Sequence, residues 1–212
     1  MKEFDDRVDE VAASEQLLAS TLGGWRGLVE SAAPTLVFIL IFTFGGKNLQ
    51  PALIAALSVG ILLTLIRLIR RQTLQQVLSG LFGLLIAAWF SSRTGKAEDF
   101  FLPGIITNVS YAAAFLASIL FRFPLVGFIV GGLQGDLLGW RKDPAKVKLF
   151  TMLTWWWVGS YLFRVVVQYP LYLAKQVEIL GTIKIVMGWP LYIAVTYATF
   201  RAVMNFEKVQ KS

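Results

Sequence analysis

The chain has 212 residues, of which 56% are hydrophobic and only 16% are charged, and its mean hydropathy is +0.64. It contains no cysteine and no histidine, which excludes disulfide frameworks, zinc sites, thiolate or imidazole nucleophiles and Ser-His-Asp hydrolysis. The net charge of +7 comes from basic residues that flank apolar runs, a pattern typical of membrane proteins and not of a nucleic-acid-binding surface. We therefore predict a membrane protein with no metal, no cofactor and no nucleic-acid partner.

Residues 1–24 come before the first long apolar run and have a helical pattern of their own. Val8, Val11, Leu18 and Leu22 recur at helical spacing, with acidic residues between them. This pattern predicts an amphipathic helix that lies at the cytoplasmic surface of the membrane. Its acidic start differs from that of a secretory signal peptide.

Six apolar runs follow, and each is close to the length of about 20 residues that a helix needs to cross a bilayer. The runs cover residues 27–44, 51–68, 74–90, 103–121, 149–173 and 183–204. We therefore predict an all-α, polytopic bundle of six transmembrane helices over residues 25–205. A short cytoplasmic tail, residues 206–212, completes the chain.

The basic residues indicate the orientation of these spans. Fourteen of the 20 basic residues fall on the N-terminal segment, on alternate links or at the C-terminal end, and only five fall on the remaining links. Basic residues near span ends resist translocation, so the richer links are expected on the cytoplasmic side. This asymmetry predicts a bacterial plasma membrane protein with both termini in the cytoplasm. Its basic links would face anionic lipid headgroups.

Residues 125–140 test the number of spans, because they are largely apolar but include Gln134 and Asp136. A seventh crossing here would place the basic residues from Arg141 to Lys148 outside and end the alternation. The stretch is also short for a crossing. We therefore predict a short interfacial or re-entrant helix on the cytoplasmic side.

Arg164 lies about fifteen residues, or roughly 22 Å, beyond the inner start of the fifth run. An arginine at that depth costs at least about 2.5–3.5 kcal/mol unless it is paired or hydrated. A binding or conduction site for a small polar or anionic species would explain it. So would an interhelical ion pair that fixes helix registration. The predicted polar cluster in the outer half of the bundle consists of Glu98, Asp99, Asn108, Arg164 and Gln168.

A second group of charges is predicted near the inner face of the membrane. Because they lie near helix ends, these side chains could instead extend separately to the headgroups. The group consists of Glu30, Arg67, Arg122, Asp136 and Arg201.

Glycine recurs at every fourth position in the short apolar stretch, at Gly127, Gly131, Gly135 and Gly139. On a continuous helix these residues would form one stripe that lets another backbone approach closely, as a packing or dimerisation face. In a glycine-rich re-entrant segment the spacing would be accidental. Both interpretations stay open.

Several stretches resemble an uncharacterised actinobacterial family of multi-pass membrane proteins. These stretches are RGLVES from Arg26, RTGKAEDFFLPG from Arg93, PLVG from Pro124, WRKDP from Trp140, RVVVQYPLY from Arg164 and MGWPLY from Met187. The span pattern is also distantly similar to that of the intracellular septation protein A family. The resemblance implies a membrane-embedded organiser of the cell envelope or of division. It implies no catalytic residue, and its motif positions fall on the same polar cluster.

From these observations we expect a non-enzymatic protein that supports envelope or division processes through helix-helix contacts. Its partners would be further copies of the chain or envelope and division proteins. The alternative is a small channel or transporter that uses the polar cluster around Arg164. A lipid-modifying enzyme is less favoured, because no paired carboxylates occur at suitable spacing within a span.

Overall fold

The computed structural model describes residues 24–70 and 74–211, and this part of the chain is helical and contains no strand. The amphipathic helix predicted for residues 1–24 lies, up to residue 23, outside the described residues. The chain divides into two compact units, Met1–Gly95 and Lys96–Ser212. Residues 206–211, predicted as a tail, continue the last helix.

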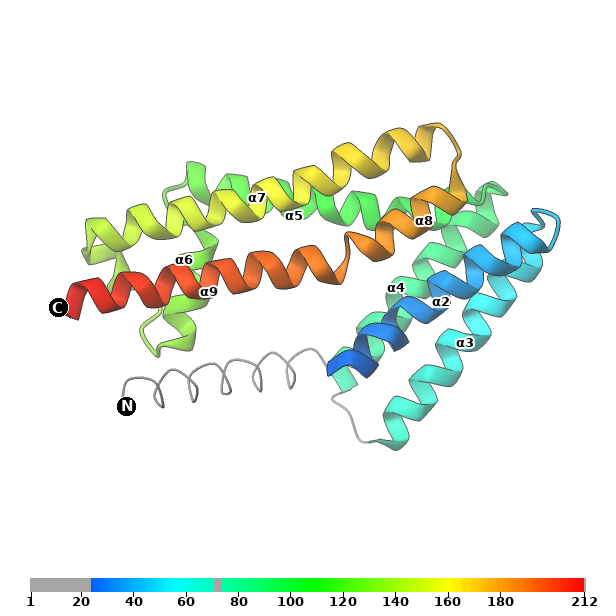
Figure 1. Ribbon diagram of the computed structural model, residues 1–212, viewed down its shortest axis with the longest axis horizontal. Coiled ribbons are helices and arrows are strands. Elements are labelled where there is room, and N and C mark those ends of the chain that lie inside the picture. Colours follow the sequence, from blue (N-terminus) through cyan, green and yellow to red (C-terminus); the bar gives the residue numbers. More distant parts are fainter. Residues whose placement is uncertain (1–23, 71–73, 212) are drawn as a thin grey trace, which may run out of the picture. The chain divides into compact units, whose positions relative to one another are not determined.

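Most of the predicted spans coincide with observed helices to within a few residues. The last predicted span is instead divided into two helices. In chain order the helices are α2 (Gly24–Phe44), α3 (Leu49–Ile69), α4 (Leu74–Thr94), η1 (Glu98–Phe100), α5 (Leu102–Leu120), α6 (Leu125–Leu133), η2 (Gly139–Lys142), α7 (Pro144–Leu173), α8 (Val177–Val186) and α9 (Trp189–Lys211) (Figure 1).

Three helical stretches among the described residues are long and apolar enough to cross a membrane. They are Leu49–Ile69, Leu102–Leu120 and Val177–Val209, the last of which joins α8 and α9. Large apolar side chains are widely exposed on these helices, Ile54, Leu62 and Ile106 among them. Such a surface is typical of helices that face lipid, because lipid tails are as apolar as the side chains themselves.

The first unit packs α3 against both α2 and α4. Small residues at four-residue spacing on α3, namely Ala52, Ala56 and Gly60, are buried and allow this close approach. A Cβ atom on Gly60 would collide with the side chain of Leu84 on α4. In the α2–α3 turn, Lys47 has a positive φ of 59°, and the Asn48 side chain caps the start of α3.

The second unit is built around α7, which contacts α5, α6, α8 and α9 (Figure 1). The side chain of Asp143 caps the start of α7 by accepting from the Ala145 and Lys146 backbone N–H groups. Pro144 then occupies the first helical position, where no N–H is needed. The buried core of this unit consists of Val126, Trp140, Phe150, Leu153 and Val203.

The stretch predicted as a short interfacial or re-entrant helix forms α6, which has only 9 residues. It ends before Gly135, whose φ of 78° takes the chain out of the helix. A helix of 9 residues spans about 13 Å, well short of the hydrocarbon thickness of about 30 Å.

Candidate functional site

The sixth predicted span is interrupted between α8 and α9, and the local sequence explains the interruption. Pro190 is the second residue of α9 and has no N–H, and its ring excludes the carbonyl of Val186, four residues earlier. Helix α8 therefore ends at Val186. Gly188 lies at the break, and its carbonyl oxygen accepts from the Tyr192 N–H at 3.3 Å.

The side chain of Arg164, on α7, binds the backbone of the segment between α8 and α9. Its Nη2 donates a hydrogen bond of 2.9 Å to the carbonyl oxygen of Gly188. Its Nε is buried and has no hydrogen-bond partner among the described residues. No carboxylate of the described residues lies within 4.0 Å of the guanidinium. The nearby titratable side chains that act on Arg164 are Tyr161 and Tyr192.

The carboxylates predicted to accompany Arg164 interact elsewhere. Asp99 accepts a 2.7 Å hydrogen bond from the hydroxyl of Tyr172, near the end of α7. Glu98 is buried beside it, within electrostatic reach of the same tyrosine. Gln168 is buried one helical turn from both Arg164 and Tyr172, so these three side chains share one face of α7.

Asn108 is also satisfied locally, because its amide donates 2.9 Å to the Gly104 carbonyl of its own helix. The predicted outer cluster therefore has two parts in the structure. One is Arg164 at the helix break, and the other is the carboxylate pair with Tyr172. The sequence analysis missed Tyr172, because an aromatic residue near a helix end is equally typical of the membrane interface.

Lys184 is a second residue that the sequence analysis did not place in a site. It lies in the last turn of α8, and its Nζ is 5.2 Å from the ring centroid of Phe101 and 5.8 Å from that of Phe100. These distances fit cation–π contacts. The amine thus packs on the aromatic rings of Phe100 and Phe101.

The predicted inner-face charges are brought together in part. Glu30 on α2 pairs with Arg67 at 2.9 Å and with Arg70 at 3.1 Å, both from the end of α3. The other three belong to the second unit. Asp136 accepts from the Gly139 N–H at 2.7 Å, the Arg201 guanidinium lies 5.9 Å from the Tyr197 ring, and Arg122 is exposed with a φ of 55°.

The four glycines do not form one helical stripe, because α6 ends before Gly135 and Gly139 lies in η2. Gly127 and Gly131 still serve close packing. A Cβ on Gly127 would lie 2.9 Å from both Phe150 and Trp140, and one on Gly131 would lie 2.8 Å from Trp140. This face of α6 is therefore covered by the indole of the same unit.

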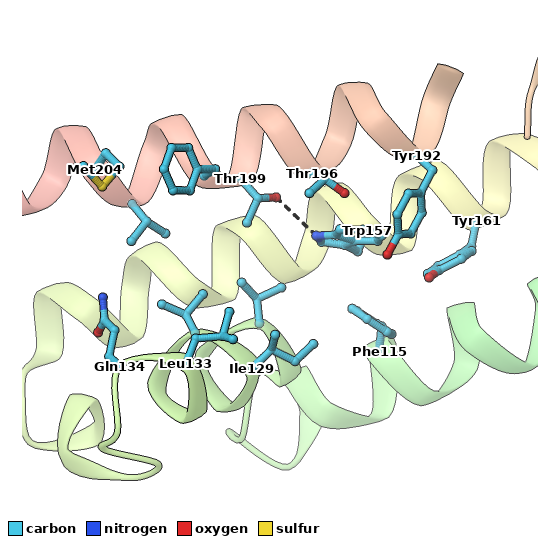
Figure 2. Close-up of a pocket in the computed structure, with 14 residues that line it drawn as sticks. Phe115, Ile129, Leu133, Gln134, Trp157, Tyr161, Tyr192, Thr196, Thr199 and Met204 are labelled. Atoms are coloured by element: carbon cyan, nitrogen blue, oxygen red, sulfur yellow. Dashed lines mark hydrogen bonds between the residues drawn. The ribbon is translucent and has the colours of Figure 1, made fainter. Parts of the chain in front are cut away.

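A cavity of about 470 Å³ lies between α5, α6, α7 and α9, and we call it the α6–α9 cavity (Figure 2). Aromatic rings of Phe115, Trp157, Tyr161 and Tyr192 line it together with apolar residues of α6 and α9. In Figure 2 the hydroxyls of both tyrosines are directed to the same end of the cavity. The indole of Trp157 donates 3.2 Å to Thr199 across it.

Sequence patterns alone did not indicate this cavity. Its lining residues come from four helices. Taken one at a time in the sequence, they resemble ordinary core residues or the aromatic residues of a membrane interface. The described residues contain no group of three or more metal-ligating side chains. The chemistry available here is therefore hydrogen bonding by hydroxyls, aromatic contact and the charge of Arg164.

The comparisons with known proteins add a family but no activity. Neither the curated proteins nor the solved structures contain a match to the chain. The resemblance to the septation protein A family has no support from these comparisons. A family model described as a protein of unknown function, DUF3159, matches residues 22–210. The chain belongs to this family.

Proposed function

We propose that this protein is a multi-pass membrane transporter or channel that binds a small anionic solute in its second unit, with Arg164 as the charged contact. The observation that carries the proposal is the environment of this residue. Arg164 donates to a backbone carbonyl at a helix break and has no carboxylate within 4.0 Å among the described residues. Its positive charge is thus available to an anion.

The energetic argument follows from burial. An ion pair would have neutralised Arg164 and made a purely structural role the simpler explanation. A carbonyl oxygen satisfies a donor but does not cancel the charge. A cationic group deep in an apolar bundle is costly, and residues of this kind mark ion or substrate pathways in membrane proteins.

The interruption between α8 and α9 also favours a negatively charged solute. Helix α9 begins at Trp189 with no acidic residue in its first turn. The N–H groups at a helix start carry partial positive charge, and interrupted helices expose such ends to substrates in transporters. The start of α9 and Arg164 together make this region electropositive.

The proposal includes the membrane and the orientation. The distribution of basic residues supports six crossings of a bacterial plasma membrane with both termini in the cytoplasm. We also propose that the protein is not an enzyme, since the hydroxyls that line the α6–α9 cavity have no carboxylate or lysine among the lining residues to act as a base.

Support of envelope or division processes through protein contacts is the second candidate. The observation that favours it is the set of exposed basic residues in η2 and the first turns of α7, namely Arg141, Lys142 and Lys148. These side chains suit anionic headgroups or an acidic partner protein. This role predicts cross-linking to envelope proteins without any solute flux.

Solute flux tests the leading proposal. The purified full chain in proteoliposomes should take up at least one of radiolabelled chloride, acetate and benzoate. Arg164→Gln should reduce that uptake at least tenfold, because a charge-assisted contact of about 1.5–3 kcal/mol is lost. Arg201→Gln, which changes an exposed arginine on α9, is the matched control and should retain uptake. Absence of uptake by the folded wild-type protein, or equal uptake by Arg164→Gln, would reject the proposal.

A further inference from the structure

Three of the hydroxyl groups that line the α6–α9 cavity lie toward one end of it. The hydroxyls of Tyr161 and Tyr192 are directed there, and Thr196 lies beside them (Figure 2). The Oγ1 of Thr196 is buried and has no hydrogen-bond partner among the described residues. The rest of the lining is aromatic or aliphatic apart from Gln134 and Thr199. A ligand that fits this cavity is therefore apolar over most of its length and polar at one end.

Arg164 is a neighbour of the two tyrosines at this end of the cavity. It is three residues from Tyr161 on α7, and its acceptor Gly188 is also the acceptor of the Tyr192 backbone N–H. Residues three or four apart share a helix face, so Arg164 is one turn from Tyr161. Tyr192 on α9 is also within electrostatic reach of the guanidinium. The buried Nε of Arg164 has no partner among the described residues, as is true of the Thr196 hydroxyl. Both α7 and α9 thus carry a buried donor without a partner in this part of the unit.

The rim of the cavity is apolar and open. Ile129 and Leu133 on α6 are 52% and 85% exposed, and Phe200 on α9 is 47% exposed. These residues line the cavity and also reach the outside of the unit. In a membrane such a rim meets lipid tails and not water, so the natural route of entry is sideways from the bilayer.

A negative charge at the opposite end of the cavity determines which way round a ligand with an anionic head binds. Gln134, at the end of α6, donates 2.5 Å to the carboxylate of Glu207 on α9 and thereby joins the two helices. The negative charge of Glu207 repels an anionic group at this end. An anionic head is therefore favoured only at the end beside Tyr161, Tyr192 and Arg164.

We infer that the α6–α9 cavity binds a single-chain amphipathic carboxylate, of the fatty-acid type, which enters sideways from the bilayer between α6 and α9. Its apolar chain lies among the aromatic rings, and its carboxylate accepts from the tyrosine and threonine hydroxyls beside Arg164. A volume of about 470 Å³ is within the range of small-molecule sites. This inference rests on the proposed function, since it names the substrate class of the same arginine.

Photolabelling tests the inference on the full chain in detergent micelles. The probe is a 16-carbon fatty acid with a diazirine in its chain, and its methyl ester is the uncharged control. We expect the acid to label peptides of α6 and α9, and to do so at least tenfold more than the ester. Arg164→Gln should remove this preference, and Thr196→Phe should block the cavity and abolish labelling.

The controls keep a folding defect apart from a binding defect. Thr107→Val changes an exposed threonine on α5, outside the cavity, and should label as the wild type does. Each variant should elute as a single species, and the acid should raise the unfolding temperature of the wild type and not that of Thr196→Phe. Equal labelling by acid and ester, or labelling outside α6 and α9, would overturn the inference.

The two proposals fail in different ways. Arg164-dependent uptake of benzoate or chloride with no preferential labelling by the fatty acid would reject the amphipathic substrate and retain anion transport. Preferential labelling that survives Arg164→Gln would reject the role of the arginine in binding the fatty acid, whereas its role in small-anion transport is decided by uptake. Labelling without uptake of the small anions would retain the cavity and reject small-anion transport.

Discussion

Two arginines within apolar helices are satisfied in opposite ways. Arg67 on α3 shares the carboxylate of Glu30 with Arg70, and the Arg67 and Glu30 side chains are only 17% and 16% exposed. Arg164 on α7 has instead a backbone carbonyl and an unpartnered Nε. A carboxylate neutralises a cation and stabilises packing, whereas a carbonyl leaves the charge for another ligand. This contrast separates a structural arginine from a candidate functional one.

The shared carboxylate leads to a stability prediction for the first unit. Glu30→Gln should lower the free energy of unfolding by about 1–3 kcal/mol, because two guanidinium groups lose a charged acceptor in a largely buried position. Thermal unfolding of the purified protein in detergent measures the change. Arg70→Gln is the matched control, because Arg70 is 51% exposed and exposed pairs contribute about 1 kcal/mol or less. Equal effects of the two substitutions would contradict this account.

Among the helices, the discontinuity between α8 and α9 matters most for function. The residues on either side are apolar enough to be read as one membrane-spanning stretch, Val177–Val209. Pro190 prevents a continuous helix, because the carbonyl of Val186 has no N–H to pair with four residues later. Arg164 binds the carbonyl of Gly188, which lies between the two helices and also accepts from the Tyr192 N–H.

Replacement of the proline should separate helix stability from function. Pro190→Ala restores the missing N–H and should let α8 and α9 join, since alanine is about 3 kcal/mol more favourable than proline inside a helix. The variant is expected to unfold at the same or a higher temperature and to lose Arg164-dependent anion uptake. Circular dichroism melts and proteoliposome uptake measure the two properties. Unchanged uptake in a more stable variant would show that the break is not required.

For the whole molecule, each of the two units has its own kind of internal packing. Small residues on α3 bring three helices together in the first unit, while aromatic side chains around α7 fill the second. The second unit also contains the short helix α6, the helix break and the α6–α9 cavity. Both proposed activities therefore belong to the second unit.

The proposed topology is open to a direct test because the chain has no cysteine. Single cysteines at Lys96 and Lys175 should react with a membrane-impermeant maleimide in intact bacterial cells. Cysteines at Lys146 and Ser212 should react only after permeabilisation, because basic links are retained on the cytoplasmic side. Labelling of Lys146→Cys in intact cells would reverse the orientation. It would also change the predicted depth of Arg164 in the membrane.

Much of the helical architecture follows from local sequence. Runs of apolar residues bounded by polar links predicted α2, α3, α4, α5 and α7 to within a few residues. Hydrophobic length is a local property, because a helix satisfies its backbone hydrogen bonds within its own segment. The sequence by itself also determined that Arg164 needs a partner, since the cost of burying a charge does not depend on the fold.

Only the tertiary structure decided which partner each polar group has. Glu98 and Asp99 looked equally suited to Arg164, yet the hydroxyl of Tyr172 reaches Asp99 and a carbonyl at the break reaches the arginine. The α6–α9 cavity could not be predicted from the sequence either, because its lining comes from four helices far apart in the chain. Spacing along a helix places side chains on a face, but which face meets which neighbour depends on long-range packing. Partners and cavities are products of that packing, and for this reason they appear only in the folded molecule.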